Sequence, residues 1–435
     1  MKSDNYQKKI DILVDYFKSG EVNDSEFKLG MEVEHFVVKE DSLEAVSYYG
    51  INGIEGILKE LLKNKWQGTY ENKNLLALKG EYADISLEPG GQLELSLHPV
   101  KTIKEIDFLY KKFLKEISLI LKKRELALLN LGYQPISKIN NVPLLPKRRY
   151  DFMYRYFKNK GKYAHNMMKG TASIQLNLDY RNEEDFSKKM RVANFLSPFV
   201  YYFFDNSPFF EGKAVHDFSV RSSIWDNCDS SRCGFIDDVF KRKLSYSDYA
   251  EYILRLPSII VMENDKLRYS GEELIQNVFE LDFFTSEKLE HLLSMAFPEV
   301  RLKKYIELRS GDSLPYPYNI AYIAFLKALL YNQNNLDKLF EESLAFKEND
   351  IRTLKNEISQ AKHDILIKNK SIDDYMLDLL SMASEGLKLE ERDYISLLED
   401  LIRNNRNPKT KTLEMFSDGY NLRDALSWCI FRGGN

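Results

Sequence analysis

The chain has 435 residues and is 44% hydrophobic, which is enough to bury a large core in one large domain or in two. Its 62 basic and 66 acidic residues leave a net charge of −4, so the composition gives no general attraction to nucleic acid. No run approaches the ~20 consecutive apolar residues of a membrane span, which excludes a helical membrane protein.

Targeting and redox signals are sparse. The N-terminus is polar and carries no apolar signal core, so we expect no targeting leader and a cytoplasmic location. Cys228, Cys233 and Cys429 form an odd set without CxxC spacing, and free thiols in a reducing compartment are the expectation. The chain contains no P-loop, no GxGxxG fingerprint and no HExxH motif.

The first part of the chain alternates helical and extended patterns. Apolar spacing of three and four predicts helices, and alternation of period two predicts strands. The expected elements are helices over 6–18, 54–63 and 102–126, strands over 30–38 and 128–135, a hairpin within 66–78, and a strand–turn–strand over 82–97. Thr102 with Glu105 three residues on is a helix-start signal.

The middle of the chain continues the mixture, and the C-terminal third changes character. We expect strands over 173–179, 258–262 and 301–309, helices over 183–204 (interrupted near Pro198), 246–256 and 287–296, and a strand or loop over 217–225. Beyond residue 314 only helical patterns follow, over 320–331, 336–346, 351–367, 375–387 and 394–403. These patterns predict a catalytic domain over 1–314 and a helical subdomain over 315–435 packed on it.

Four of the predicted strands carry polar side chains on one face only. The polar residues are Glu32 and Glu34 in the first strand, Glu88, Gln92 and Glu94 around a Pro-Gly-Gly turn, Gln175, Asn177 and Asp179 in the third, and Lys303, Glu307 and Arg309 in the last. If these strands share one sheet, one face gathers carboxylates, amides and cations. Carboxylate oxygens bind Mg²⁺, and the cations suit phosphate, so the pattern is typical of a nucleotide-phosphate site. His35 lies on the opposite face and is expected to be structural.

Seven segments, in order, resemble the plant-type glutamate–cysteine ligase family. They are GMEVEH (30–35), ISLEPGGQLELS (85–96), KRRYD (147–151), MMKGTASIQLNLD (167–179), NSPFFEGK (206–213), RSSIW (221–225) and PEVRLKKYIELR (298–309). The resemblance covers residues 27–314 and continues more weakly through the helical tail. It implies an α+β fold with a curved, mostly antiparallel, funnel-like sheet flanked by helices, as in the glutamine synthetase catalytic core.

The family resemblance also implies a reaction, the first step of glutathione synthesis. ATP would phosphorylate the γ-carboxylate of glutamate, and the amine of cysteine would displace phosphate. The chain would act on small molecules, without nucleic acid or membrane, as a monomer or a homodimer.

The same resemblance assigns roles to individual residues. Magnesium ligands would be Glu32, Glu34, Glu88, Glu94 and Glu307. ATP or its metal would contact Gln175, Asn177, Lys303 and Arg309. Lys303, Arg309 and Arg221 would neutralise negative charge during catalysis. Arg221 would hold the glutamate α-carboxylate, and Arg149 would bind substrate or phosphate. The acceptor pocket would be lined by Tyr150, Thr171 and Trp225.

Two other functions stay open from the residues alone. One keeps the chemistry but uses a different amine or amino acid as acceptor, because the acceptor half of the site cannot be read from the sequence. The other is a non-catalytic nucleotide- or amino-acid-binding relative. The intact set of carboxylates argues against it, since crowded carboxylates without a cation repel one another.

Overall fold

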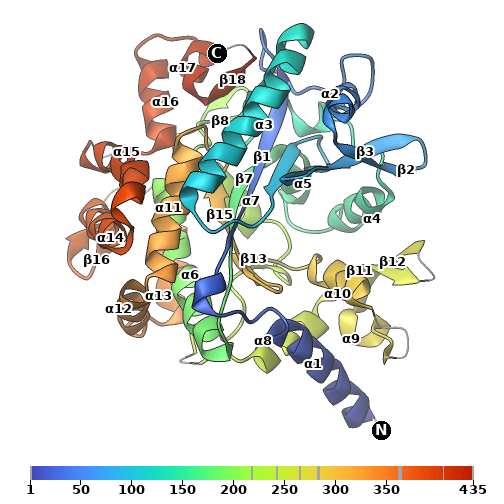
Figure 1. Ribbon diagram of the computed structural model, residues 1–435, viewed down its shortest axis with the longest axis vertical. Coiled ribbons are helices and arrows are strands. Elements are labelled where there is room, and N and C mark those ends of the chain that lie inside the picture. Colours follow the sequence, from blue (N-terminus) through green and yellow to red (C-terminus); the bar gives the residue numbers. More distant parts are fainter. Residues whose placement is uncertain are drawn as a thin grey trace.

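The computed structural model describes residues 2–433 apart from 217–218, 242, 264–265, 282–284, 361–364 and 405. A central sheet carries helices on its apolar face, with the C-terminal helices on one side and the hairpin of β11 (Pro257–Glu263) and β12 (Lys266–Leu274) on the other (Figure 1). None of the helices in the described part of the chain is long and apolar enough to cross a bilayer. The predicted α+β class is confirmed.

The central sheet has ten strands among the described residues, in the order β14-β15-β7-β1-β5-β4-β3-β2, and β6 and β18 extend from β1. Every pair in it is antiparallel. The strands are β1 Leu29–Lys39, β2 Gln67–Glu71, β3 Asn74–Lys79, β4 Ala83–Leu87, β5 Leu93–Leu97, β6 Leu126–Leu129, β7 Ser173–Leu178, β14 Val300–Leu302, β15 Ile306–Asp312 and β18 Ile430–Arg432. The long strand β1 pairs with β5 and β7 in its first half and with β6 in its second.

The remaining elements are helices and four two-stranded ribbons. The helices are α1 Lys2–Lys18, α2 Ile54–Leu61, α3 Ile103–Arg124, α4 Arg148–Phe157, α5 Ala164–Gly170, α6 Glu183–Phe203, α7 Val220–Asp226, α8 Tyr246–Arg255, α9 Ile275–Val278, α10 Ser286–Leu293, α11 Tyr318–Tyr331, α12 Gln333–Ser343, α13 Glu348–Ser359, α14 Ile372–Gly386, α15 Asp393–Arg403, α16 Pro408–Ser417 and α17 Leu422–Ala425. Besides β11–β12, the ribbons pair β8 Phe209–Phe210 with β9 Lys213–Ala214, β10 Cys233–Gly234 with β13 Phe297–Pro298, and β16 Leu366–Ile367 with β17 Lys370–Ser371.

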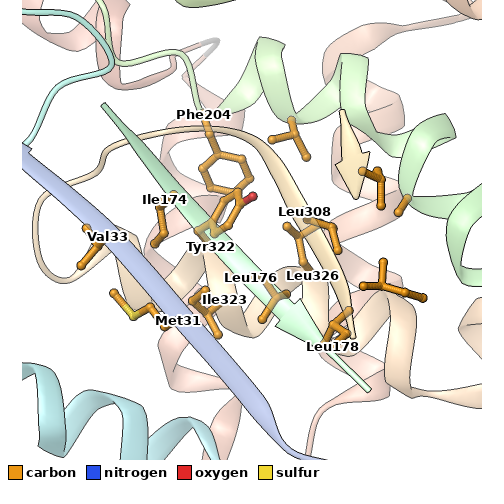
Figure 2. Close-up of a cluster of buried hydrophobic side chains, with 14 of the residues drawn as sticks. Met31, Val33, Ile174, Leu176, Leu178, Phe204, Leu308, Tyr322, Ile323 and Leu326 are labelled. Carbon is orange, nitrogen blue, oxygen red and sulfur yellow. The ribbon is translucent and has the colours of Figure 1, made fainter. Parts of the chain in front are cut away.

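The apolar face of the sheet packs on α11. Met31 and Val33 of β1 and Leu176 of β7 point toward Tyr322 and Ile323 of this helix, and all five are fully buried (Figure 2). The helix is apolar around most of its circumference, as expected for a helix that is covered on every side. Burying one such aliphatic side chain contributes about 1.5–3 kcal/mol, so this contact fixes the sheet firmly from behind.

Helix α6 is continuous, although the sequence predicted an interruption at Pro198. A proline cannot donate to the carbonyl four residues earlier, which here belongs to Asn194. The hydroxyl of Ser197 donates to that carbonyl at 3.0 Å instead. The local bond that proline removes is therefore replaced, and the helix continues to Phe203. At α3 the predicted capping box between Thr102 and Glu105 is confirmed.

Three other expectations differ from the structure. Residues 220–226 form a helix rather than a strand or loop, while 217–218 lie outside the described residues. The predicted strand over 301–309 is a hairpin of β14 and β15, so Arg301 lies opposite Glu307 rather than along the same strand. The C-terminal part is not purely helical, because β16, β17 and β18 are strands and β18 completes the central sheet. The division at residue 314 stays a prediction.

Candidate active site

The strand register brings the predicted polar residues onto one face of the sheet. Glu34 of β1 lies directly opposite Glu94 of β5, Glu32 is opposite Gln175 of β7, and Asn177 is opposite Glu307 of β15. Directly opposed residues of antiparallel strands point to the same side, with Cβ atoms about 4.5–5.5 Å apart. Glu88 comes directly after β4, beside the Pro-Gly-Gly turn. The alternation in the sequence therefore predicted this face correctly.

The carboxylates on β1 and β5 accept hydrogen bonds from neutral neighbours. The backbone N–H and the hydroxyl of Ser173 donate to Glu34 at 2.8 and 3.1 Å. The amide of Asn177 donates to Glu32 at 2.7 Å, and the hydroxyl of Ser86 donates to Glu94 at 2.8 Å. Among the residues that the structure describes, no cation forms an ion pair with Glu32, Glu34, Glu88 or Glu94.

Removal from water and mutual repulsion raise the pKa values of these carboxyls. Burial, with Glu307 and Glu94 nearby, raises the pKa of Glu32 to about 7. Burial together with Glu88 and Glu94 raises the pKa of Glu34 to about 8. Burial and Glu88 raise the pKa of Glu94 to about 7, and burial also raises that of Glu88. Burial is the largest cause in each case, and nearby cations such as Lys303 and Arg309 only partly oppose it.

Glu307 is in the opposite situation. It is fully buried and pairs with Arg301 at 2.6 Å, with Lys303 at 3.1 Å and with Arg309. Burial alone would raise the pKa of Glu307, but these three cations hold it well below its usual value. Arg301 has no role in the sequence-based assignment. The signal that identifies it is the pairing of β14 with β15, which the sequence does not reveal.

Arg309 joins the two groups of charges. Its guanidinium donates to the amide oxygen of Gln175 at 2.9 Å as well as to Glu307. The oxygen of Gln175, predicted as an ATP or metal contact, is thus already bonded. The amide nitrogen of Gln175 donates toward Glu34 at 3.4 Å. Lys303 lies at the same corner and also donates to the hydroxyl of Tyr305 at 3.2 Å.

Arg221 and Trp225 of α7 approach this corner from the side. The buried guanidinium of Arg221 donates to the backbone oxygens of Ser310 at 3.0 Å and Arg309 at 2.8 Å. Its Nε and the Nε1 of Trp225 are buried without a hydrogen-bond partner among the described residues. Both residues line a small recess together with Arg309, Phe297 and Glu299. The recess has a volume of only about 10 Å³, so a substrate acceptor can reach these two unbonded donors only if the lining of the recess moves.

The other predicted substrate contacts are used within the protein. Arg149 donates to the hydroxyl of Ser294 at 2.8 Å and lies 3.2 Å from His291 of α10. The hydroxyl of Tyr150 donates to the carbonyl of Leu87 at 2.8 Å, and that of Thr171 donates to the carbonyl of Met167 at 2.7 Å. The bond of Tyr150 anchors α4 against β4, those of Arg149 tie α4 to the end of α10, and that of Thr171 caps α5. A substrate role for the three residues stays a prediction.

The cysteines and His35 behave as expected. All three cysteines are free. His35 is fully buried on the far face, 3.1 Å from the carbonyl of Leu93 and 3.1 Å from the hydroxyl of Tyr110.

The carboxylate face carries oxygen donors of the kind that Mg²⁺ prefers, with one exception among the predicted ligands. Within the described ranges, no three acidic, histidine or cysteine side chains are arranged as a ligand set. The buried side-chain oxygen of Asn177 has no hydrogen-bond partner among the described residues, and it lies beside Glu32. Four unneutralised carboxylates and a free carbonyl oxygen are the hard donors that Mg²⁺ prefers. Glu307 fits poorly, because three cations already occupy its oxygens.

The central sheet therefore carries carboxylates, amides and arginines on one face and helices on the other, which is the arrangement that the resemblance to a ligase family implied. The model of glutamate-cysteine ligase family 2 matches residues 28–426. The chain is 28% identical over 417 residues to the glutamate–cysteine ligase, chloroplastic, of Arabidopsis thaliana, covering 93% of this chain and 79% of that protein. It is 29% identical over 416 residues to glutamate–cysteine ligase A, chloroplastic, of Oryza sativa subsp. japonica, covering 93% and 84%.

A solved structure supports the same fold. The glutamate–cysteine ligase of Francisella tularensis in complex with AMP superposes with a TM-score of 0.56 at 13% identity, covering 93% of this chain and 87% of that one. The family match spans most of the sequence. The protein belongs to glutamate-cysteine ligase family 2.

Proposed function

We propose that the protein is an ATP- and Mg²⁺-dependent ligase that joins the γ-carboxylate of glutamate to the amine of cysteine through a γ-glutamyl phosphate. The observation that carries the proposal is the cross-strand alignment of Glu34 with Glu94 and of Glu32 with Gln175, beside the cationic corner of Arg309 and Lys303. Phosphoryl transfer depends mainly on positioning and on neutralising phosphate charge, and this face offers groups for both.

The residues of the chain would divide this work. Arg309 and Lys303 are held in place by Glu307, and their remaining N–H groups can bond to phosphate oxygens. The Nε of Arg221 and the Nε1 of Trp225 have no partner among the described residues and would bond to a carboxylate of the amino-acid substrate. Because these donors are buried, such bonds would be stronger than in water.

The carboxylate group would hold the metal. Glu32, Glu34, Glu88 and Glu94, with the amide oxygen of Asn177, are the residues that would bind Mg²⁺. When bound, Mg²⁺ would neutralise phosphate oxygens and orient ATP. Before it binds, the raised pKa values of Glu32, Glu34 and Glu94 mean that these side chains take up protons near neutral pH.

The test is phosphate release from Mg-ATP and glutamate, measured with cysteine and with a panel of other amines, with the product mass recorded. Cysteine-dependent release with γ-glutamylcysteine as the product is the expected result. Release that requires a different amine would contradict the cysteine assignment and leave the activation chemistry in place. No release with any acceptor would overturn the proposal.

A further inference from the structure

A second cavity lies behind the central sheet, on the side away from the carboxylates. It has a volume of about 530 Å³ and is bounded by α3, by the segment around Tyr316 and by the residues leading into β18. Ligand sites in proteins measure about 300–1,000 Å³, so the cavity is large enough for a small organic molecule. No residue assigned above to the candidate active site lines it.

The charged residues that line this cavity are all cations. They are Lys111, Lys115 and Arg432, and no acidic side chain is among the lining residues. Lys111 pairs with Asp107 at 2.9 Å, whereas Lys115 has no ion pair among the described residues. The Nε of Arg432 forms an ion pair with Glu40 at 3.5 Å but makes no hydrogen bond there. The ammonium of Lys115 therefore supplies the unpaired positive charge, which suits a carboxylate, sulfonate or phosphate.

The walls of the cavity are aromatic. The rings of Tyr110 and Tyr316 lie 6.4 Å apart and within 29° of parallel. Tyr316 is 39% exposed, and Lys111 lies 5.1 Å from the centre of its ring. Trp428 contributes a further ring. Tyr110 is buried between His35 and Tyr316, so the rings that can meet a ligand are those of Tyr316 and Trp428. Stacking on such a ring contributes about 0.5–1.5 kcal/mol beyond the area buried, and it favours a flat apolar body.

Two chains of hydrogen bonds connect the wall of the cavity to the carboxylate face. The hydroxyl of Tyr110 lies 3.1 Å from His35, which directly follows Glu34 on β1. Independently, the amide of Asn130, another lining residue, donates to the hydroxyl of Ser313 at 3.1 Å. That hydroxyl donates to the backbone oxygen of Glu34 at 2.6 Å. A ligand that shifts the wall would therefore shift the strand that carries Glu34.

We propose that this cavity is a second binding site, specific for a planar organic anion, and that its occupancy is transmitted to Glu34 through Tyr110 and Asn130. Binding of the anion in this cavity does not depend on the ligase function. The effect of the bound anion on Glu34, when measured by turnover, rests on that function.

Binding is tested on the full chain with 1-anilinonaphthalene-8-sulfonate, a fluorescent aromatic sulfonate. We expect the double variant Lys115→Gln, Arg432→Gln to weaken its affinity at least tenfold. Lys104→Gln is the matched control, since it removes an exposed cation from the same helix outside the cavity. The uncharged analogue N-phenyl-1-naphthylamine should bind both proteins equally. Equal affinity of the sulfonate for the wild type and the double variant would overturn the site.

Transmission is tested by repeating the phosphate-release assay with the sulfonate at saturation. We expect kcat or KM to change at least threefold in the wild type, and the double variant to need at least ten times more sulfonate for the same change, because linked sites influence each other. Unchanged constants in an active enzyme would overturn transmission. If the protein has no ligase activity, the readout is hydrogen–deuterium exchange of the β1 backbone amides around Glu34, and exchange that does not change when the sulfonate binds would overturn transmission.

Discussion

Glu94 and Glu307 lie on the same face of the same sheet, yet their surroundings put them in opposite electrostatic states. Glu307 is enclosed by Arg301, Lys303 and Arg309, and its pKa is far below normal. Glu94 faces other carboxylates, and burial and Glu88 raise its pKa to about 7. Residue type and strand parity are the same for both, so the difference comes from which strands lie beside them.

The comparison separates two tasks on one surface. The corner of β14 and β15 holds one carboxylate among three cations, and Glu307 positions these cations so that they can face phosphate. The carboxylates of β1 and β5 form no ion pair among the described residues and gain from a bound cation or from protons. We therefore expect replacement of Glu307 to affect mainly folding, and replacement of an unpaired carboxylate such as Glu94 to affect mainly activity.

Glu307→Gln is the variant with the largest expected effect. It leaves three cations around a neutral amide in a buried corner, and breaking a buried ion pair on one side costs about 3–5 kcal/mol. We expect the free energy of unfolding in urea to fall by about that much. The control is Glu251→Gln, which breaks an exposed pair with Arg255 worth about 0.3–0.5 kcal/mol. A loss as small as the control's would show that Glu307 does not hold the corner together.

Glu94→Gln should show the reverse pattern. Turnover should fall at least about 100-fold, which corresponds to about 2.7 kcal/mol of transition-state stabilisation. The free energy of unfolding at pH 8 should be unchanged or higher, because one repelling charge is removed from the group. Asp84→Asn is the control, since Asp84 has the same parity on β4 but is half-exposed and lies 3.5 Å from His98. Near-normal turnover in Glu94→Gln would remove the basis for the metal assignment.

The unbalanced carboxylates also predict a pH dependence of stability. Their pKa values of about 7 for Glu32 and Glu94 and about 8 for Glu34 exceed the ordinary value of 4.5. The stability that protonation contributes is present in full below pH 4.5 and is lost as pH rises through 7 to 8. Without Mg²⁺, the thermal midpoint should therefore fall between pH 6.5 and 9, and Mg²⁺ should restore it at the upper end.

The measurement is a series of thermal melts with and without Mg²⁺. The double variant Glu32→Gln, Glu94→Gln should show a flatter profile, because two of the groups that titrate in this window are removed. Glu34 still titrates, as does Asp312, whose pKa burial and Asp205 raise to about 7. His35, whose burial lowers its pKa to about 4, changes charge below this window and does not interfere. A wild-type midpoint that is constant from pH 6.5 to 9 would contradict the repulsion among these carboxylates.

The polar face of each strand could be predicted from the sequence because it depends on alternation alone. Period-two spacing put Glu32 and Glu34 on one face of their strand and Glu94 on one face of its own, and the assumption of a shared sheet, which the pairing of β1 with β5 confirms, brought them together. The capping of α3 needed only Thr102 and Glu105. Contacts between distant segments could not be predicted in this way. The pairing of Arg301 with Glu307 requires the turn between β14 and β15, which the sequence pattern represented as one continuous strand.

The same limit applies to helix ends and to the C-terminal region. Pro198 suggested a break in α6, and only the bond of Ser197 to Asn194 shows why the helix continues. The valine and isoleucine of α7 favoured a strand or loop, although residues 220–226 form a helix there. Strand β18 is three residues long and forms only because β6 is beside it, so no local signal announces it.

Replacing Arg149 has the smallest expected effect, and it tests whether the active site extends to α4. Family resemblance predicts that it contacts substrate or phosphate, whereas the structure directs it to Ser294 and His291 of α10. Burial and the nearby guanidinium lower the pKa of His291 to about 4, so the imidazole is neutral and can accept a hydrogen bond from Arg149.

If Arg149 serves to anchor α4, Arg149→Gln should lower the free energy of unfolding by about 1.5–3 kcal/mol, the range for a charged hydrogen bond. The KM values for glutamate and ATP should then change less than threefold. Arg221→Gln is the matched comparison, because its unpartnered Nε makes a larger rise in one KM the expected result. A tenfold rise for Arg149→Gln with unchanged stability would mean that its guanidinium leaves α10 when substrate binds, and that the active site extends to α4.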